Sequence, residues 1–489
     1  MLTSLTTVIV SWVVVCLVFA GGIWVFGRVG RWAWIGRLGA VVLTCVCLVC
    51  AIGLTINRPM GYVSDPGDLM RLVSPSHTDD LSPAEVGTPP TPAPAASLGP
   101  LTELPTSTAP VRSSSAERAK WNPDWHDEGG GVRSAKWTGP TSKATELVRV
   151  WTPRGYSPTD KQRYSVIVFL HGSPGSPQGV IESLDARRQL QDLIDRKVIP
   201  PSIFVVPEVN LAGGPPSCAD IPGKPQAQKW LSVDIPTMIR TQFPNVATER
   251  ANWLVMGISS GAYCAGRTAL VHPEIWGAAG VLSGYDYPVV GALGQGSKEL
   301  GRANTLSVML ARERAFPVWL YLSGTQSDPD SVNVAHTIVT GPLHSDDRIY
   351  THITPTGGHN WVQWKGELPL IMTWWGKQLN HDHVGAEAAP QVGGDVTAEH
   401  KPETYAPTPF SLMGWATLTV SIIVAASCVL VFVWVLPARS RARHSRPGVF
   451  KRGFGLGMCV ITLVVAIGLV VNKMEEFYAS IGELLSEIG

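Results

Sequence analysis

Charged side chains are scarce in this sequence of 489 residues, where Asp, Glu, Lys and Arg make up 16% against roughly 25% in an average soluble protein. Neither sign of charge is in excess, because 39 basic residues oppose 38 acidic ones. That balance excludes a broadly basic nucleic-acid-binding protein. Cysteine is also sparse, with eight in the chain, which excludes a small disulfide-rich scaffold. Hydrophobic residues reach 45%, so the composition indicates a membrane protein with a sizeable soluble part.

In place of charge, the sequence has four long apolar runs, each near the length of about 20 residues that crosses a bilayer. Membrane spans are expected at Leu5–Phe26, Leu38–Asn57, Ser411–Leu436 and Gly453–Asn472. The first run is interpreted as a span and not as a cleavable signal peptide. It lacks a positively charged start, and a second span follows at once.

The short loop inside each pair of spans is rich in basic residues. The first loop holds Arg28, Arg31 and Arg37, and the second holds Arg439, Arg441, Arg443, Arg446, Lys451 and Arg452. Short basic loops stay on the cytoplasmic side of a membrane. Both loops are therefore expected in the cytoplasm, with residues 58–410 and both termini outside it. Contact with anionic lipids is an additional role that this orientation allows for the second loop.

Composition divides the chain into six parts. Two of them carry a pair of spans each, two lack apolar periodicity and are expected to be flexible linkers rich in Pro and small residues, and the tail is expected to be a short amphipathic helix. In order, they are spans at 1–57, a linker at 58–120, a folded domain at 121–380, a linker at 381–410, spans at 411–472 and the tail at 473–489.

Within residues 121–380, short runs of Val, Ile, Leu and Phe alternate with stretches of helical character. The runs do not alternate apolar with polar residues, which is typical of parallel strands covered on both faces. Strands are expected at Thr145–Thr152, Ser165–Leu170, Ser202–Val206, Asn252–Met256, Gly277–Leu282, Val318–Leu322 and Tyr350–Thr354, and helices at Ile181–Lys197, Lys229–Phe243, Ser260–Val271 and Trp361–Leu379. This pattern predicts an α/β fold, a mostly parallel sheet with helices on both faces.

The most informative motif is Gly257-Ile258-Ser259-Ser260-Gly261, which lies between an expected strand and an expected helix. A sharp turn from strand to helix holds a serine in a strained conformation, and flanking glycines permit the close approach of the chain. Such a turn lifts the hydroxyl above the sheet, beside the positive end of the helix. Ser259 is therefore the candidate nucleophile, and an ordinary strand–helix turn is the alternative.

A serine nucleophile needs a base and an orienting acid, which follow it in α/β-hydrolases in the order acid and then histidine. The candidate base is His359, in a glycine-rich loop between the last strand and the last helix of the domain. The candidate acid is Asp328, after the strand Val318–Leu322, and Asp330 is the alternative. Capping the following helix is the other role open to these carboxylates. No calcium loop is completed around them, so neither a metal nor a cofactor is expected.

Two backbone N–H groups are needed to stabilise the oxyanion of an acyl-transfer reaction. One is expected at Ser260, the residue after the nucleophile. The other is expected at Gly172 or Ser173, in a glycine-rich loop that leaves the strand Ser165–Leu170. His171 is expected to support this loop and not to transfer protons.

Cys218 and Cys264 are the two cysteines outside the expected spans. An oxidising compartment favours their pairing, and the crosslink would hold the loop Val209–Pro222 beside the active site, because Cys264 lies one turn into the helix after Ser259. Two buried thiols are the alternative. The other six cysteines, at positions 16, 45, 47, 50, 428 and 459, are expected to be apolar residues of the spans.

The domain resembles the putative esterase family of α/β-hydrolases, the group that contains esterase D-type enzymes and the bacterial mycolyltransferases. The resembling segments are VRVWTPRGY, VIVFLHGSPGS, GISSGAYCAGRTALVHP and GGHNWVQW, within roughly Trp121–Leu379. With its flanking spans, the chain is similar to membrane-anchored esterases of actinobacteria. The resemblance implies an α/β-hydrolase fold, with Ser259, His359 and Asp328 as nucleophile, base and acid. The loop sequence HGSPG differs from that of the mycolyltransferases.

The sequence thus predicts a membrane-anchored, extracytoplasmic serine esterase. Its expected substrate is an acyl ester of a cell-envelope lipid or glycan, and no nucleic acid or cofactor is expected. Transfer of the acyl group to a sugar or lipid hydroxyl needs the same residues and remains open. A hydrolase fold that only binds is the alternative from another class. Four spans without charges inside them do not favour an ion path.

Overall fold

A computed structural model describes residues 5–28, 30, 32–60, 120–173, 175–211, 218–223, 225–381, 392–396, 409–412, 414–435, 448–475, 477–478 and 481. The chain divides into two compact units. One comes from its two ends, residues 1–69 and 406–489, and the other from its centre, residues 70–405.

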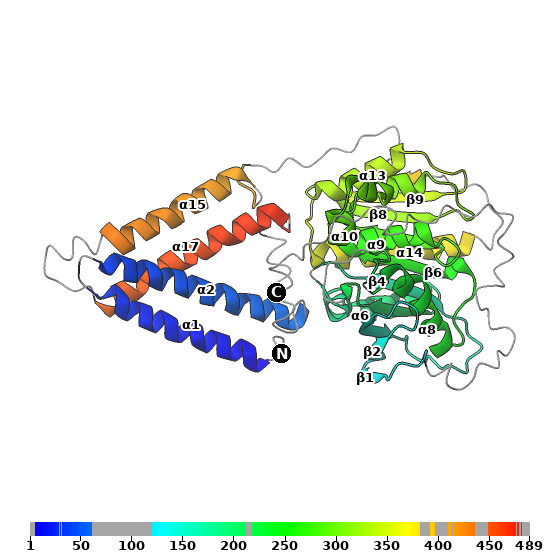
Figure 1. Cartoon of the computed structure of the whole chain (residues 1–489), viewed down its shortest axis with the longest axis horizontal. Helices are drawn as coiled ribbons and strands as arrows, with labels where there is room; N and C mark the ends of the chain where they lie inside the picture. Colours follow the sequence, from blue (N-terminus) through cyan, green and yellow to red (C-terminus); the bar gives the residue numbers. More distant parts are fainter. Residues whose placement is uncertain are drawn as a thin grey trace. The chain divides into compact units, whose positions relative to one another are not determined.

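The described residues of the first unit form four helices long and apolar enough to cross a membrane (Figure 1). They are α1 (Leu5–Phe26), α2 (Ala33–Met60), α15 (Trp415–Val429), which continues as a π-helical segment (Leu430–Val435), and α17 (Val449–Glu475). α17 packs against each of the other three helices, and α1 also packs against α2. Most of the remaining apolar side chains on these helices are exposed, as is expected of surfaces that face lipid.

The first basic loop is shorter than the sequence predicted, because Arg37 lies within α2. Its side chain is buried and donates hydrogen bonds to the carbonyls of Phe26 (3.3 Å), Arg28 (2.6 Å) and Val433 (3.4 Å). The guanidinium therefore satisfies carbonyls at the end of α1, where a helix lacks its own donors. In the second loop, Lys451 and Arg452 lie at the start of α17. Arg31 and the basic residues 439–446 lie outside the described residues, as do residues 61–119 of the predicted linker, whose first three residues belong to α2.

The central unit is built on a ten-stranded sheet with the order β1-β2-β3-β5-β4-β6-β7-β8-β9-β10. Its strands are β1 (His126–Gly129), β2 (Val132–Thr138), β3 (Thr145–Trp151), β4 (Ser165–Leu170), β5 (Ser202–Pro207), β6 (Trp253–Ile258), β7 (Ala278–Leu282), β8 (Trp319–Thr325), β9 (Arg348–Thr354) and β10 (Val392–Gly394). β1, β2 and β3 pair antiparallel, as do β3 and β5, and all other pairs are parallel. Every residue of β4, β5, β6, β7 and β8 is buried, which explains their unbroken apolar sequence.

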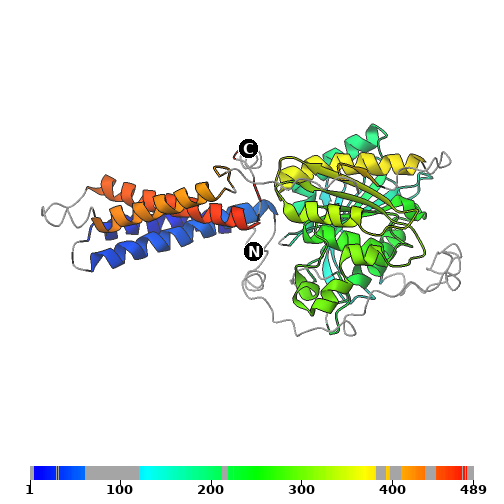
Figure 2. The ribbon, with the colours of Figure 1, turned by 90° about the horizontal axis from the view of Figure 1, so that it is seen from above.

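Helices cover both faces of this sheet. They are α5 (Pro177–Ser183), α6 (Ala186–Asp195), α7 (Ala227–Lys229), α8 (Ile235–Gln242), α9 (Ser260–Val271), α10 (Gly291–Gln295), α11 (Lys298–Ala303), α12 (Leu306–Leu310), α13 (Pro329–Thr340) and α14 (Trp361–His381). α14 and α6 pack together on one face, whereas α9 crosses β6 and β7 on the other (Figure 2). The predicted α/β fold, a mostly parallel sheet with helices on both faces, is confirmed.

The linker predicted at residues 381–410 needs correction, because part of it forms an edge strand of the sheet. β10 lies inside residues 381–410, where a linker was predicted, and His381 belongs to α14. Polar contacts fix this strand: the Asp395 carboxylate accepts a hydrogen bond from the N–H of Ile353 (2.8 Å), and the N–H of Val396 donates to the Thr351 hydroxyl (2.8 Å). Apolar periodicity carries no signal for such a strand.

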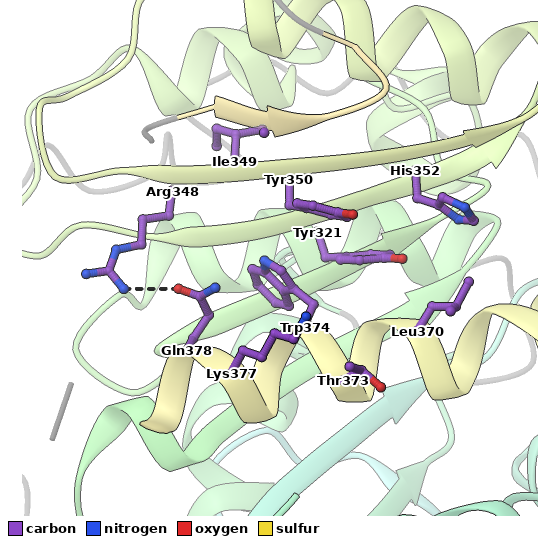
Figure 3. A pocket seen from close by; sticks show the side chains of 11 residues that line it. Tyr321, Arg348, Ile349, Tyr350, His352, Leu370, Thr373, Trp374, Lys377 and Gln378 are labelled. Carbon is purple, nitrogen blue, oxygen red and sulfur yellow. Dashed lines mark hydrogen bonds between the residues drawn. The ribbon is translucent and has the colours of Figure 1, made fainter. Parts of the chain in front are cut away.

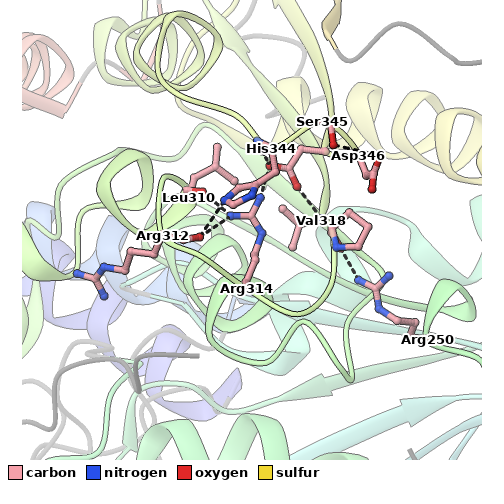
Figure 4. Close-up of polar contacts among 10 residues, drawn as sticks. Arg250, Leu310, Arg312, Arg314, Val318, His344, Ser345 and Asp346 are labelled. Carbon is pink, nitrogen blue, oxygen red and sulfur yellow. Dashed lines mark hydrogen bonds and ion pairs between the residues drawn. The ribbon is translucent and has the colours of Figure 1, made fainter. Parts of the chain in front are cut away.

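At the amino ends of β8 and β9, buried charges hold two loops together. The buried Asp347 carboxylate pairs with Arg314 and accepts hydrogen bonds from the N–H groups of Val318 (3.0 Å) and His344 (3.1 Å). Figure 4 shows the His344 imidazole and the Arg314 guanidinium meeting the main chain between Leu310 and Arg312. This cluster lies at the opposite ends of the strands from Ser259, so we interpret it as structural.

Candidate active site

Ser259 occupies the tight turn between β6 and α9. Its backbone angles are φ 54° and ψ −125°, a conformation that costs a residue with a side chain about 1–3 kcal/mol. A hydrogen bond from its N–H to the carbonyl of Leu282 (3.0 Å) fixes the turn against the end of β7. The serine is therefore held in a strained position at the carboxyl edge of the sheet.

Three glycines make this turn possible. A Cβ on Gly257 would lie 2.4 Å from the carbonyl oxygen of Gly261, and one on Gly261 would lie 2.2 Å from that of Leu170. These distances are shorter than any real carbon–oxygen contact, and both oxygens belong to the backbone. A Cβ on Gly172 would lie 3.2 Å from Cβ and 3.7 Å from Oγ of Ser259. The loop after β4 thus passes close to the serine, with little room for a side chain at Gly172.

His359 and Asp328 lie together beyond the ends of β9 and β8. His359 Nδ1 is 3.0 Å from Asp328 Oδ2, and the two side chains are 20% and 4% exposed. With Nδ1–H donating to the carboxylate, Nε2 is the nitrogen that can accept a proton. β6 and β8 are separated by β7 alone, so about 10 Å of sheet lies between the end of the serine's strand and that of the acid's.

The two candidate acids differ in their contacts. Asp328 stands at the N-cap position of α13, yet its side chain makes no capping hydrogen bond and instead meets His359. Asp330 lies in the first turn of α13. Burial raises the pKa of Asp330, the neighbouring charge of Asp328 raises it further, and His359 opposes both effects. The structure therefore places Asp328, and not Asp330, on the imidazole.

The loop that carries His359 is fixed from two sides. Gly357 has φ +132°, and its carbonyl accepts a hydrogen bond from the Ser327 hydroxyl, next to Asp328. On the other side, the Trp364 ring meets the imidazole edge-on, with 5.2 Å between ring centroids. Imidazole and carboxylate are thus positioned by contacts outside the pair itself.

A buried ion pair supports the loop after β4. His171 is fully buried; Nδ1 lies 2.7 Å from the carbonyl oxygen of Gly172, and Nε2 lies 2.8 Å from Glu208 Oε1. Burial lowers the pKa of His171, but the charge and hydrogen bond of Glu208 outweigh it and raise the pKa above 6.5. In the protonated ring both nitrogens donate, and these two bonds satisfy both.

This arrangement sets the direction of one peptide group. The Gly172 carbonyl points toward His171, and in a trans peptide the N–H of the next residue points the opposite way. The N–H of Ser173 is therefore directed away from His171. Ser260, the other predicted donor, is the first residue of α9, where helix N–H groups lack partners within the helix.

Two hydroxyl groups that the sequence analysis missed lie at the same edge. Ser283 directly follows β7 with φ 48°, and Tyr285 stacks on Tyr263 of α9 with 5.4 Å between ring centroids. Among the described residues, the buried hydroxyl of Ser283 has no hydrogen-bond partner, and the Ser260 hydroxyl lies beside that of Tyr285. Orphaned buried donors beside a nucleophile are suited to a polar substrate group. The sequence signal that could have indicated Ser283 is the pair Ser283-Gly284 directly after β7, which repeats the Ser260-Gly261 pair after β6.

Cys218 and Cys264 form a disulfide, with 5.4 Å between their Cα atoms. Cys264 belongs to α9, and the buried Arg267 on the same helix donates a hydrogen bond to the carbonyl of Cys218. Covalent and polar contacts thus attach the segment around Cys218 to the helix that follows the nucleophile. The described residues contain no cluster of three or more His, Cys, Asp or Glu side chains placed to hold a metal ion.

The fold and the strained serine turn define an α/β-hydrolase. Residues 143–375, which lie within the α/β unit, match the family model described as "Putative esterase".

Solved structures with a similar fold include several esterases. An S-formylglutathione hydrolase from Agrobacterium tumefaciens shares 15% identity over 53% of this chain and 99% of its own, with a TM-score of 0.42. An S-formylglutathione hydrolase from Staphylococcus aureus shares 13% identity over 50% of this chain and 97% of its own, with a TM-score of 0.37. The enterobactin esterase of Shigella flexneri shares 18% identity over 51% of this chain and 60% of its own, with a TM-score of 0.40. Among curated proteins, none matches this sequence.

Proposed function

We propose that the chain is a membrane-anchored serine esterase in which Ser259, His359 and Asp328 act as nucleophile, base and orienting acid. One observation carries the proposal: the pair of His359 and Asp328, 3.0 Å apart, stands at the same sheet edge as the strained turn of Ser259. An isolated strained serine would suit an ordinary turn. A histidine already oriented by a buried carboxylate beside it is typical of acyl transfer.

The first half of the reaction forms an acyl-enzyme. Nε2 of His359 takes the proton of the Ser259 hydroxyl while Oγ attacks the ester carbonyl carbon. The negative charge that develops on the carbonyl oxygen is stabilised by the N–H groups of Ser260 and of Ser173, with Gly172 allowing the close approach. His359 then gives its proton to the leaving alcohol, and Asp328 stabilises the imidazolium in between.

The second half repeats these steps with water. His359 takes a proton from water, the hydroxide attacks the acyl carbon, and Ser259 leaves with the proton returned by the imidazolium. A sugar or lipid hydroxyl that enters in place of water gives acyl transfer with the same residues. The unpartnered hydroxyl of Ser283 supports a polar acceptor or leaving group, because it is available to bind one.

Location guides the choice of substrate. The four apolar helices support attachment to a membrane, and the basic residues near their ends support a cytoplasmic position for both short loops. The disulfide between Cys218 and Cys264 supports an oxidising compartment for the α/β unit. An enzyme held there meets acylated lipids and glycans of the cell envelope, which we propose as its substrate class.

A fluorophosphonate probe tests the nucleophile in the intact membrane protein. Ser259 Oγ should displace fluoride from phosphorus as its proton passes to His359, which leaves a phosphonyl adduct on a Ser259 peptide in mass spectrometry. Ser259→Ala should abolish labelling, whereas Ser345→Ala, on an exposed loop, should not. A folded wild-type protein without the adduct would leave a binding module as the better interpretation. A second assay separates hydrolysis from transfer. The enzyme is given a radiolabelled acyl donor and a sugar acceptor, and the amounts of labelled free acid and labelled acylated sugar are compared.

A further inference from the structure

A cavity of about 430 Å³ lies between α14 and the strands β8, β9 and β10 (Figure 3). Its volume is within the range of small-molecule sites, roughly 300–1,000 Å³. Thr373 of α14 lines the cavity. At 1.5 Å per residue, this position lies roughly 18 Å along the helix from Trp361, the first residue after the His359 loop. The cavity is therefore separate from the proposed catalytic residues.

Polar side chains at one end of the cavity already have partners within the protein. The buried Glu367 carboxylate accepts a hydrogen bond from the Tyr321 hydroxyl (2.5 Å) and lies 3.0 Å from Nδ1 of His352. The Thr373 hydroxyl donates to the carbonyl of Pro369 (2.7 Å). A polar ligand would have to compete with contacts that the protein makes for itself.

The other end of the cavity is engaged in the same way. Arg348 donates a hydrogen bond to the side-chain oxygen of Gln378 (3.0 Å) and lies over the Trp319 ring at 4.7 Å. Lys377 is exposed, so water solvates its ammonium group without a ligand. Neither end of the cavity therefore requires a charged or hydrogen-bonding ligand.

The rest of the wall is aromatic and aliphatic. Tyr321 stacks on Tyr350 with 5.4 Å between centroids and 21° between planes, and the ring of Trp374 meets Tyr321 at 5.4 Å and 55°. Figure 3 shows the three rings gathered between the strands and α14. Leu370 lines the cavity too and is 45% exposed. An apolar ligand that covered this surface would remove it from water, which is favourable.

The size of the cavity limits what such a ligand can be. An apolar cavity of about 150 Å³ holds the six carbons of benzene, so on that scale 430 Å³ has room for at most roughly 17 carbon atoms. That is one long acyl chain. Residues 382–391, which connect α14 to β10, offer Val384 alone as a large aliphatic side chain, so the protein itself is a poor source of such a ligand. Four helices apolar enough to cross a membrane make lipid the available source.

We infer that this cavity binds a single acyl chain of a membrane lipid, packed against Tyr350, Trp374 and Leu370. A chain of methylene groups needs no hydrogen bonds, so the internal contacts of the polar side chains stay intact when it binds. Binding at a site apart from Ser259 would keep the α/β unit at a lipid surface while its catalytic residues act there. The inference rests on the membrane attachment in the proposed function and not on its catalysis.

Photolabelling in nanodiscs tests the inference on the full-length Ser259→Ala protein. The probe is monopalmitoylglycerol with a diazirine in its acyl chain, added at a low mole fraction to phosphatidylcholine. On irradiation the diazirine loses molecular nitrogen, and the carbene that remains inserts into a neighbouring C–H or O–H bond. Mass spectrometry should find adducts on peptides of β9 and of residues 370–378. An excess of unlabelled monopalmitoylglycerol should remove these adducts, whereas glycerol should not.

Two variants test the cavity itself. Gly393 pairs with Tyr350 in the sheet, and a Cβ on it would lie 3.6 Å from Cδ2 of that ring, an ordinary contact, so Gly393→Leu should fill the cavity. Gly393→Leu and Leu370→Gln should each lower these adducts at least about fivefold relative to adducts on the membrane helices. Val308→Gln removes a side chain that is 40% exposed elsewhere on the α/β unit and should leave the ratio unchanged.

Several results would overturn the inference. One is a protein whose membrane helices are labelled while peptides of β9 and residues 370–378 are not. Adducts that excess unlabelled lipid does not reduce would show ordinary contact with the bilayer, and adducts that glycerol removes would show a polar site. Undiminished labelling in both Gly393→Leu and Leu370→Gln, with native thermal midpoints, would place the lipid elsewhere. Because the nucleophile is absent, these outcomes do not depend on the proposed catalysis.

Discussion

Asp328 and Asp330 are two positions apart, and the sequence alone does not separate their roles. Both carboxylates follow the same strand and precede the same helix, so the strand pattern and the capping rules fit either one. What separates them is the direction of the Asp328 side chain, whose Oδ2 lies 3.0 Å from Nδ1 of His359. Asp330 is a residue of the first turn of α13. Such a direction depends on backbone angles that local composition does not reveal.

Neutralising the two acids in turn should have unequal effects on catalysis. Asp328→Asn keeps the shape of the side chain but favours the wrong tautomer of His359, so kcat/KM for a soluble ester should fall by roughly 10²–10⁴-fold. Asp330→Asn should change it by less than about threefold. Steady-state kinetics of both variants, with thermal midpoints as the check on folding, measure the difference. A larger loss in Asp330→Asn would reverse the assignment.

His171 should make activity depend on pH through the loop that it supports. Its pKa is raised in the folded protein, so the stabilisation from its pair with Glu208 is complete below the ordinary value of 6.5 and is lost as pH rises through the raised value. When His171 loses its proton, one of its two hydrogen bonds is lost, either the one to the Gly172 carbonyl or the one to the Glu208 carboxylate. The N–H of Ser173 then loses its fixed direction, and kcat should fall on the alkaline side.

Two variants of His171 separate charge from shape. His171→Asn can still donate to the Gly172 carbonyl but has no titrating proton, so its kcat should lack the alkaline decline. His171→Ala should lower kcat/KM on the order of 10²-fold, because one oxyanion donor is misplaced. The pH profiles of kcat for the three proteins give the answer. An unchanged alkaline limb in His171→Asn would assign that limb to another group.

Among whole elements, β4 and α9 were predictable to the residue, whereas the equally buried strands β5, β6 and β7 differ from their expected bounds by one or two residues. β4 and α9 have the expected bounds, Ser165–Leu170 and Ser260–Val271, because one is buried throughout and the other starts at the glycine-flanked serine. β1 and β2 were missed, since β1 is exposed at every position and its neighbour carries charged residues. The helix expected at Ile181–Lys197 is broken at Asp185, where φ is +50°. No glycine or proline marks that break.

The loops at the amino ends of β8 and β9 should depend on one ion pair. Asp347→Ala leaves Arg314 buried without its counter-charge and should cost about 3–5 kcal/mol. Asp346→Ala, at the adjacent exposed position, should stay within about 0.5 kcal/mol. Thermal or urea unfolding, followed by tryptophan fluorescence, compares the two. Equal stability of the two variants would show that the loops are held by other contacts.

The disulfide should contribute to the same unfolding transition. Closing a loop of this length, 46 positions apart, stabilises a domain by roughly 2–4 kcal/mol through the unfolded chain. Replacement of both Cys218 and Cys264 by serine should lower the unfolding midpoint, and a reductant should lower that of the native protein equally. Cys16→Ser, in α1, should leave the midpoint of the α/β unit unchanged. A reductant effect that persists in the double variant would not come from this bond.

For the molecule as a whole, the proposed orientation fixes which side of the membrane each surface meets. A cysteine at the exposed position of Asp160, in the α/β unit, should react with a membrane-impermeant maleimide in intact cells. A cysteine at Arg28, after α1, should react only after the cells are permeabilised. Gel-shift labelling of the two variants reads this out. Labelling of Arg28→Cys alone in intact cells would invert the topology.

The close approach of the backbone around Gly172, Gly257 and Gly261 has a consequence for how the gene can vary. Every single-base change of a glycine codon that alters the residue adds at least one carbon atom, and two of these three positions have a main-chain oxygen where that atom would stand. In a library of random mutants selected for ester hydrolysis, no amino-acid substitution should therefore be recovered at those two codons. At Gly257 and Gly261, selection for activity therefore requires a residue without a Cβ atom.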